Sequence, residues 1–186
     1  MNKVIFIPGF LRKTGAPAPL KRILGKNFEI IDFVYDTSGR TRIEILAKRL
    51  KKFIDKIPLK KDEKINIIAF SMGGLIASYY SKFIDNKRIS KLITVATPFR
   101  GSHWAARFFS KRNAIKQMRP RSYFLKRLNK KKFTRIKQES FWDKHDIIVG
   151  GSSAKYGHSR KFNFFLHPFA SYWPPLINKI AKELEK

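Results

Sequence analysis

The chain has 186 residues, of which 43% are hydrophobic, and this is enough for one domain with a buried core. It contains no cysteine, which excludes a disulfide framework and thiolate chemistry. Its 41 Lys and Arg residues against 13 Asp and Glu residues leave a formal net charge of +28, so the protein will attract anionic surfaces.

The N-terminus shows no secretion signal, because the apolar stretch from Val4 to Pro8 is too short for the central region of a signal peptide. No apolar run reaches the length of a transmembrane helix. We therefore expect a cytoplasmic protein. The charge leaves peripheral contact with an anionic membrane open.

The first half of the chain alternates between two hydrophobic patterns. Continuous apolar runs predict strands, and apolar residues at helical spacing predict helices. We expect strands at 4–7, 28–35, 64–70 and 89–96, and helices at 20–24, 41–57 and 72–85. Strands that alternate with helices predict a parallel sheet wrapped on both faces.

The second half has weaker patterns and more charge. Short basic helices with aromatic faces are expected at 102–113 and 121–129, and a weak strand at 132–140. A last strand is expected at 161–166, and an amphipathic helix at 174–186 closes the chain. No repeat interrupts this order, so we expect a single domain over residues 1–186.

A serine follows the most hydrophobic of the expected strands. The run from Ile65 to Phe70 ends at Ser71, with small residues (Ala69 and Gly73) two positions to either side. A strand, a tight turn at a serine and a helix are the parts of a nucleophile elbow, in which a Cβ at Gly73 would collide with its neighbours. The N–H of Met72, at the helix N-terminus, would point toward an oxyanion. The alternative is a helix cap after a buried strand.

Four further segments accompany this serine. They are Phe6-Ile7-Pro8-Gly9-Phe10, then Thr97-Pro98-Phe99-Arg100-Gly101-Ser102, then Asp146-Ile147-Ile148-Val149, and His167 before the last helix. Together with the A-x-S-x-G pattern, they resemble the small bacterial lipase/esterase type of α/β-hydrolase. The resemblance implies a mostly parallel central sheet with helices on both faces, in a minimal version that lacks the first two strands of the family.

The resemblance also implies roles for these residues. Ser71 would be the nucleophile, His167 the base and Asp146 the acid that orients it, in the chain order typical of hydrolases. The backbone N–H groups of Phe10 and Met72 would form the oxyanion hole. The chain departs from the family pattern at Pro8, Ala69 and Leu166, and none of these departures removes a catalytic group.

Other residues compete for the acid and the base. Asp143 lies near Asp146, but only Asp146 has the D-x-x-V spacing with an apolar, strand-like stretch after it; Asp143 is more typical of a surface or loop-capping residue. His158 follows Asp146 too closely for a helix and a strand to intervene, whereas His167 precedes the final helix. His103 and His145 are expected at the surface. A buried structural role remains the alternative for His167.

The segment 100–130 combines aromatic residues with cations, and the chain has no acidic residue between Asn86 and Gln138. One interpretation is a cap or lid over the serine that also contacts a membrane. The other is a pair of ordinary helices whose aromatic faces pack on the sheet. Aromatics among Lys and Arg also suit single-stranded nucleic acid, but no nucleic-acid motif accompanies them, so this partner is not expected.

These patterns predict a serine hydrolase that cleaves carboxylic esters through an acyl-enzyme. The rival hypothesis is a non-catalytic basic module of the same fold that binds anionic membrane or nucleic acid. No cofactor is expected because there is no glycine-rich phosphate loop. No metal is expected because cysteine is absent and the histidines lack ligand spacing. The sequence leaves the acyl length and the oligomeric state open.

Overall fold

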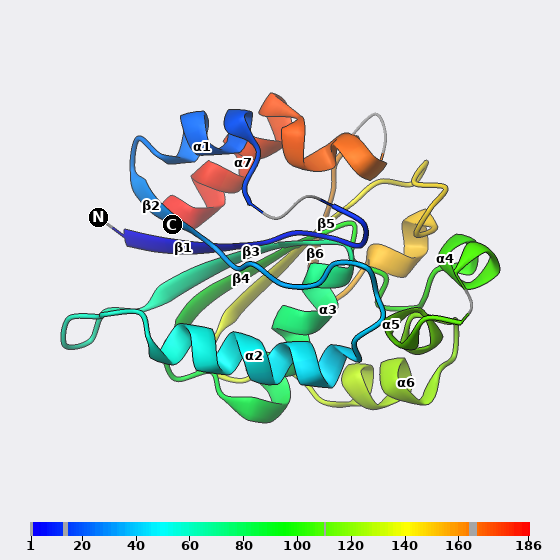
Figure 1. Ribbon diagram of the computed structural model, residues 1–186. Coiled ribbons are helices and arrows are strands. Elements are labelled where there is room, and N and C mark those ends of the chain that lie inside the picture. Colours follow the sequence, from blue (N-terminus) through cyan, green and yellow to red (C-terminus); the bar gives the residue numbers. More distant parts are fainter. Residues whose placement is uncertain (1, 13–14, 110, 164–166) are drawn as a thin grey trace.

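A parallel sheet forms the centre of the molecule (Figure 1). The computed structural model describes residues 2–12, 15–109, 111–163 and 167–186. Within these residues the sheet has six strands in the order β2-β1-β3-β4-β5-β6, and each neighbouring pair is parallel. The strands are β1 (Asn2–Ile7), β2 (Phe28–Asp32), β3 (Ile65–Phe70), β4 (Ile89–Val95), β5 (Lys137–Trp142) and β6 (His158–Lys161). Their carboxyl ends therefore share one edge.

β3 lies inside the sheet and is buried along its whole length. Its nearly continuous apolar sequence is typical of a strand that is covered on both faces. The registers place Ile5 beside Ile67 and Ile68 beside Ile93, so β-branched side chains stack across the centre. The four strands expected in the first half are confirmed, although β2 ends at Asp32 rather than at residue 35.

Helices cover both faces of the sheet (Figure 1). α1 (Ala18–Leu24) and α7 (Pro174–Glu185) lie on one face, whereas α2 (Ile43–Asp55) and α3 (Met72–Tyr79) lie on the other. Each face has its own hydrophobic core: Leu20 and Ile177 belong to the first, and Leu46 and Leu75 to the second. The predicted sheet wrapped on both faces is confirmed.

The helices of the first half lie where the sequence predicts them: α1 begins two residues earlier than expected, and the other two have shorter ends. α2 covers Ile43–Asp55 rather than 41–57. The helix expected over 72–85 is α3 followed by a π-helical turn, η1 (Tyr80–Ile84), and this turn buries the side chain of Lys82. Among the described residues, no helix is both long and apolar enough to cross a membrane.

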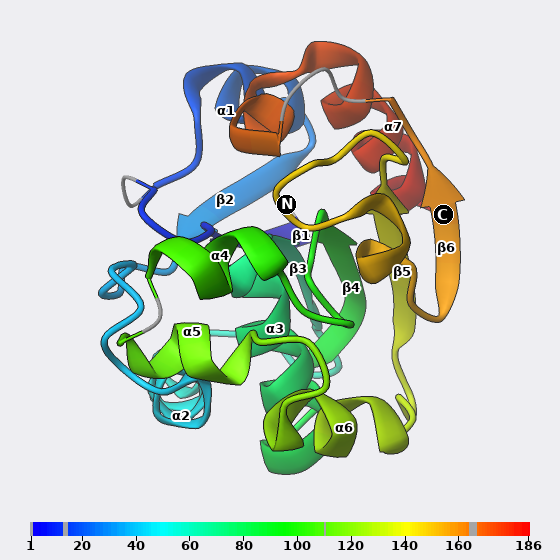
Figure 2. The same cartoon turned by 90° about the vertical axis from the view of Figure 1, so that its right-hand side faces the viewer.

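Short helices gather at the edge where the strands end, which Figure 2 views directly. They are α4 (His103–Phe108), α5 (Asn113–Gln117), α6 (Tyr123–Lys130) and the 3-10 helices η2 (Gly151–Ala154) and η3 (His167–Tyr172). The helix expected over 102–113 ends at Phe108. A second helix, α5, was not expected and begins at Asn113, the predicted end of the first.

The last two strands differ from the prediction. β5 begins at Lys137 rather than at residue 132, because Arg135 adopts a left-handed φ of 64° that breaks the extended run. The strand expected at 161–166 is wrong at its start, since β6 ends at Lys161; residues 164–166 lie outside the described part of the chain. β6 is an edge strand with no buried residue, so hydrophobic patterning could not reveal it.

Candidate active site

Ser71 occupies a sharp turn between β3 and α3. Its backbone has a φ of 50° and a ψ of −122°, which is a strained conformation for a residue with a side chain. The turn is held from both sides: the Ser71 N–H donates to the carbonyl of Val95 at 2.8 Å, and its carbonyl accepts from the N–H of Gly74 at 3.0 Å. The strand, strained serine and helix expected from the sequence are all present.

Two glycines let the loop after β1 lie directly against this turn. A Cβ on Gly73 would lie 2.5 Å from the carbonyl oxygen of Pro8 and 2.7 Å from that of Ile7, so the predicted collision is confirmed. A Cβ on Gly9 would lie 2.9 Å from the Cβ of Ser71. The backbone near Gly9 is therefore in contact with the serine.

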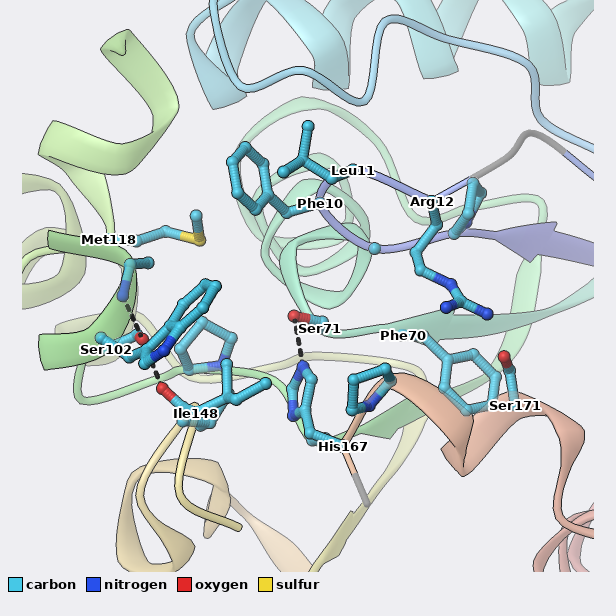
Figure 3. Close-up of a pocket in the computed structure, with 18 of the residues that line it drawn as sticks. Phe10, Leu11, Arg12, Phe70, Ser71, Ser102, Met118, Ile148, His167 and Ser171 are labelled. Carbon is cyan, nitrogen blue, oxygen red and sulfur yellow. Dashed lines mark hydrogen bonds between the residues drawn. The ribbon is translucent and has the colours of Figure 1, made fainter. Parts of the chain in front are cut away.

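Three side chains from distant parts of the sequence form a chain of contacts, and Figure 3 shows the part of it between Ser71 and His167. His167 Nε2 lies 3.2 Å from Ser71 Oγ, and His167 Nδ1 lies 2.7 Å from Asp146 Oδ2. A carboxylate can only accept a hydrogen bond, so Nδ1 carries the proton in the neutral ring and Nε2 presents a lone pair to the serine. The three residues expected to act together are thus brought together.

A tight turn fixes Asp146. Its Oδ1 accepts hydrogen bonds from the N–H groups of Ile148 and Val149, both at 3.0 Å, which leaves Oδ2 for His167. The carboxyl group is buried. The strand-like stretch expected after Asp146 is wrong: residues 147–149 form a turn, because their N–H groups bond to the carboxylate rather than to a neighbouring strand.

The competing residues lie elsewhere. Asp143 is buried rather than on the surface, and its Oδ1 accepts from the N–H of His145 at 2.9 Å, as a loop-capping residue would. His158 lies in β6, with its Nδ1 3.4 Å from Glu139 Oε1. His145 and His103 are exposed, as expected. The structure therefore places His167, and none of the other three histidines, beside Ser71.

Hydrogen bonds from the segment after β2 anchor the loop that follows β1. The Tyr35 hydroxyl donates to the Pro8 carbonyl at 2.6 Å, and its burial raises the pKa of that hydroxyl, so it stays protonated. The Leu11 N–H donates to the Thr37 carbonyl at 2.9 Å, and Thr37 Oγ1 donates to the Arg12 carbonyl at 2.8 Å. The sequence did not reveal Tyr35 or Thr37, because the motif around Gly9 contains no sign of which distant residues hold its loop in place.

The two expected oxyanion donors flank the serine. Met72 follows Ser71 at the start of α3, and Phe10 follows Gly9, whose backbone contacts the serine. Neither N–H donates to another group in the described parts of the chain. An oxyanion held near the first turn of α3 would also interact favourably with the helix dipole.

A cavity of about 240 Å³ has Ser71 and His167 in its wall (Figure 3). Most of its lining is apolar and comes from the loops at the carboxyl edge of the sheet: Phe10, Leu11, Phe70, Pro98, Trp104, Met118, Ile148, Val149, Pro168 and Tyr172 all contribute. Polar side chains in the wall, besides the serine and histidine, are Arg12, Ser102 and Ser171. A mainly apolar cavity with a few polar groups suits an acyl group.

Some residues of the basic segment 100–130 line the cavity, and others are buried in the hydrophobic core. Trp104 and Met118 line the cavity, whereas Phe124, Leu125 and Leu128 of α6 are buried in the core beside α3. Only the earlier part of the segment therefore borders the serine.

No group of three or more His, Asp or Glu residues within the described ranges could hold a metal ion.

Residues 7–146, more than half of the chain, match the family model described as the alpha/beta hydrolase fold. The chain belongs to the α/β-hydrolase family. Its parallel sheet with helices on both faces is consistent with the minimal version of the fold that the sequence predicts, and membership supports a hydrolase function.

Individual proteins resemble this chain over different lengths. It is 35% identical over 81 residues to phospholipase A(1) LCAT3 of Arabidopsis thaliana, a match that covers 41% of this chain and 18% of that protein. The chain thus matches less than a fifth of the length of that relative.

Two solved structures share the α/β-hydrolase fold. Phospholipase PlaB from Legionella pneumophila has a TM-score of 0.59 and 18% identity, over 70% of this chain and 34% of that one. A monoacylglycerol lipase from Paleococcus ferrophilus has a TM-score of 0.72 and 16% identity, over 98% of this chain and 93% of that one. Identities this low show the fold alone.

Proposed function

We propose that this α/β-hydrolase is a serine esterase or lipase that works through an acyl-enzyme. One observation carries the proposal: Asp146, His167 and Ser71 form a continuous chain of contacts that ends in a mainly apolar cavity. The strained backbone of Ser71 supports it, because such strain persists where function requires a particular side-chain position.

The reaction follows from the contacts. His167 Nε2 accepts the proton of Ser71 Oγ while Oγ attacks the ester carbonyl. Asp146 stabilises the imidazolium through Nδ1, and the two N–H groups of Phe10 and Met72 stabilise the oxyanion. The imidazolium then gives its proton to the leaving alcohol, and the acyl group stays on Oγ. Water, deprotonated by His167, attacks the acyl-enzyme, releases the acid and restores Ser71.

The oxyanion donors supply the largest part of the stabilisation in this scheme. Removal of one such donor in a serine hydrolase typically costs about 3–4 kcal/mol of transition-state stabilisation. Here both donors are backbone groups, and Tyr35 and Thr37 hold the loop that carries Phe10. The donors are therefore positioned before substrate binds.

The cavity and the relatives support a lipid-like ester as the substrate. The apolar wall suits an acyl chain, and the names of the compared proteins describe lipases and phospholipases. The net charge and the exposed aromatic rings of Trp104, Phe108 and Phe169 support peripheral contact with an anionic membrane. In this proposal, the earlier part of the segment 100–130 is a cap that meets the lipid.

The test compares hydrolysis of a series of p-nitrophenyl esters by the wild type, by Ser71→Ala and by Ser152→Ala, with intact-mass detection of a fluorophosphonate adduct. Ser152 is the matched control because it is exposed and does not line the cavity. We expect activity and an adduct in the wild type and the control, and neither in Ser71→Ala. A folded wild type without activity or adduct would leave the non-catalytic basic module as the better hypothesis.

A further inference from the structure

Arg12 is an unusual residue in the wall of the cavity. It is the only Lys or Arg among the lining residues of the described chain, and its neighbours in the wall are mostly apolar. Its side chain is half-buried, and Figure 3 shows it extending from the loop after β1 toward Phe70 and Ser171. A guanidinium keeps its charge at any pH relevant to the protein, so the cavity contains a fixed positive charge.

No carboxylate neutralises this charge. All acidic residues of the chain lie in the described ranges, and none of them forms an ion pair with Arg12. Asp32 is already engaged by Lys21 Nζ at 2.9 Å and by the N–H of Ala16 at 2.7 Å. The contact made by the guanidinium is with the ring of Tyr172, 5.1 Å from its centroid, and an aromatic face leaves the N–H donors of the fork free for a ligand.

Hydrogen bonds to the loop after β1 fix the backbone position of Arg12. The same two bonds to Thr37 that anchor the loop hold the backbone on either side of Arg12: Leu11 donates its N–H to Thr37, and Arg12 accepts from the Thr37 hydroxyl. Phe10, with its proposed oxyanion donor, belongs to the same short loop. The backbone of Arg12 is thus held near Ser71, and the ring of Tyr172 packs against its guanidinium.

The cavity has two chemically different sides (Figure 3). On one side, Ser102 bonds to the carbonyls of Ile148 and Met118, and the apolar side chains of these two residues line the wall. On the other side, Arg12 packs on Tyr172, next to Ser171. Ser71 and His167 lie between these sides in the close-up. An ester bound at Ser71 would therefore extend one half into apolar surroundings and the other half toward a cation.

We propose that Arg12 binds an anionic oxygen group of the substrate, a phosphate or a carboxylate, and so selects negatively charged esters. The inference rests on the proposed esterase function and names its substrate class. The planar fork of an arginine binds two oxygens of such a group at once, and the low polarity of the cavity strengthens these bonds.

The experiment uses two soluble substrates with the same acyl chains, one with a charged and one with a neutral phosphate group. These are monomeric 1,2-dihexanoylglycerol 3-phosphate and its neutral dimethyl phosphotriester, and release of hexanoate is measured at 0.15 M salt. We expect the wild type to prefer the phosphate in kcat/KM by roughly 10- to 100-fold, as charge-assisted hydrogen bonds allow. Arg12→Gln should bring this ratio close to one, mainly through KM, and Arg12→Lys should keep part of it because the charge remains.

Arg22→Gln is the matched control, since it removes one positive charge from an exposed position of α1 outside the cavity. The control should keep the wild-type ratio, which separates local recognition from the attraction exerted by the net charge. A second pair of substrates, mono-p-nitrophenyl glutarate and p-nitrophenyl butyrate, then compares kcat/KM for a carboxylate and a neutral ester. This pair distinguishes selection of a carboxylate from selection of a phosphate. Equal kcat/KM for the charged and neutral esters in the wild type, or an unchanged preference in Arg12→Gln, would overturn the proposal.

A binding measurement separates this inference from the esterase function. Calorimetric titration with hexyl phosphate should show binding to the wild type and to Ser71→Ala, and none to Arg12→Gln. If the wild type lacks esterase activity but binds hexyl phosphate in an Arg12-dependent way, the catalytic proposal fails and the anion site stands. If esterase activity is present and Arg12→Gln binds hexyl phosphate as the wild type does, the anion site fails and the catalytic proposal stands.

Discussion

Two regions of this protein hold a cation without a carboxylate partner, and they accommodate its charge differently. Arg12 stands in the cavity wall and packs on one aromatic ring. Lys82 is buried below α3, where its Nζ donates to Tyr156 Oη at 2.6 Å and to the Leu128 carbonyl at 3.0 Å. The rings of Phe133 and Tyr156 also face that Nζ, at 4.3 and 4.2 Å from their centroids.

The two cations differ because the Lys82 ammonium can lose its proton and the Arg12 guanidinium cannot. Burial lowers the pKa of Lys82 from 10.5 to about 7, so the lysine can become neutral inside the fold. An arginine cannot do so, and the charge of Arg12 must be met by water or by a ligand. From this comparison we expect Lys82 to affect the stability of the fold and Arg12 to affect substrate binding. Three predictions compare the cavity side of the molecule with the Lys82 region, in order of decreasing effect.

The largest effect should come from His167→Ala, because Ser71 would lose its base. We expect kcat to fall by about 10,000-fold or more, as in other triads, while the free energy of unfolding changes little. The check is ester turnover beside denaturant unfolding, with His158→Ala as control, since His158 is exposed on the edge strand. A His158→Ala variant that loses activity while His167→Ala keeps it would reverse the assignment.

The second effect is a pH dependence of stability that comes from Lys82. Between pH 10.5 and about 7, Lys82 binds a proton in the unfolded chain but not in the folded chain. The free energy of unfolding therefore falls as the pH falls through this window. Below about pH 7 the contribution of Lys82 is constant. In Lys82→Met this dependence is absent.

The measurement is denaturant unfolding of both proteins at pH 7, 8, 9 and 10, where all other titrations cancel in the difference. The wild type should lose about 3 kcal/mol relative to Lys82→Met from pH 10 to pH 7. A difference that stays constant across this range would show that Lys82 keeps its proton in the folded protein.

The smallest effect is expected at two tyrosine hydroxyls, of which Tyr35 is buried and Tyr156 is half-buried. Tyr35→Phe removes the bond that anchors Pro8 in the oxyanion loop, whereas Tyr156→Phe removes a bond to Lys82. We expect Tyr35→Phe to lower kcat by roughly 3- to 10-fold, as the loss of one positioning hydrogen bond allows. Tyr156→Phe should lower stability and leave kcat per folded molecule as in the wild type. Equal kcat values in both variants would contradict a positioning role for Tyr35.

The sequence predicts the centre of this fold well, because central strands of a parallel sheet are continuous apolar runs. The turn at Ser71 is equally visible, since it needs a glycine at position 73 and a helix directly after the serine. The placement of His167 beside Ser71 and Asp146 agrees with the order of the motifs.

The parts that escaped prediction depend on contacts across the fold. β6 is a polar edge strand whose partner is β5, so its own residues give no hydrophobic signal. Tyr35, Thr37 and Arg12 gain their roles only when the segment after β2 meets the loop after β1. Spacing along the chain does not reveal such meetings, because the side chains involved belong to no local pattern.

The turn at Asp146 holds its carboxylate through backbone groups, so this position does not depend on the side chains of the turn. Backbone N–H groups of residues 148 and 149 hold the carboxylate, whereas the Ile147 side chain points outward and is 82% exposed. Any residue at position 147 that tolerates the turn would leave the acid in place. A cysteine placed at position 147 would therefore give this cysteine-free chain a unique thiol for labelling, without altering the contacts of Asp146.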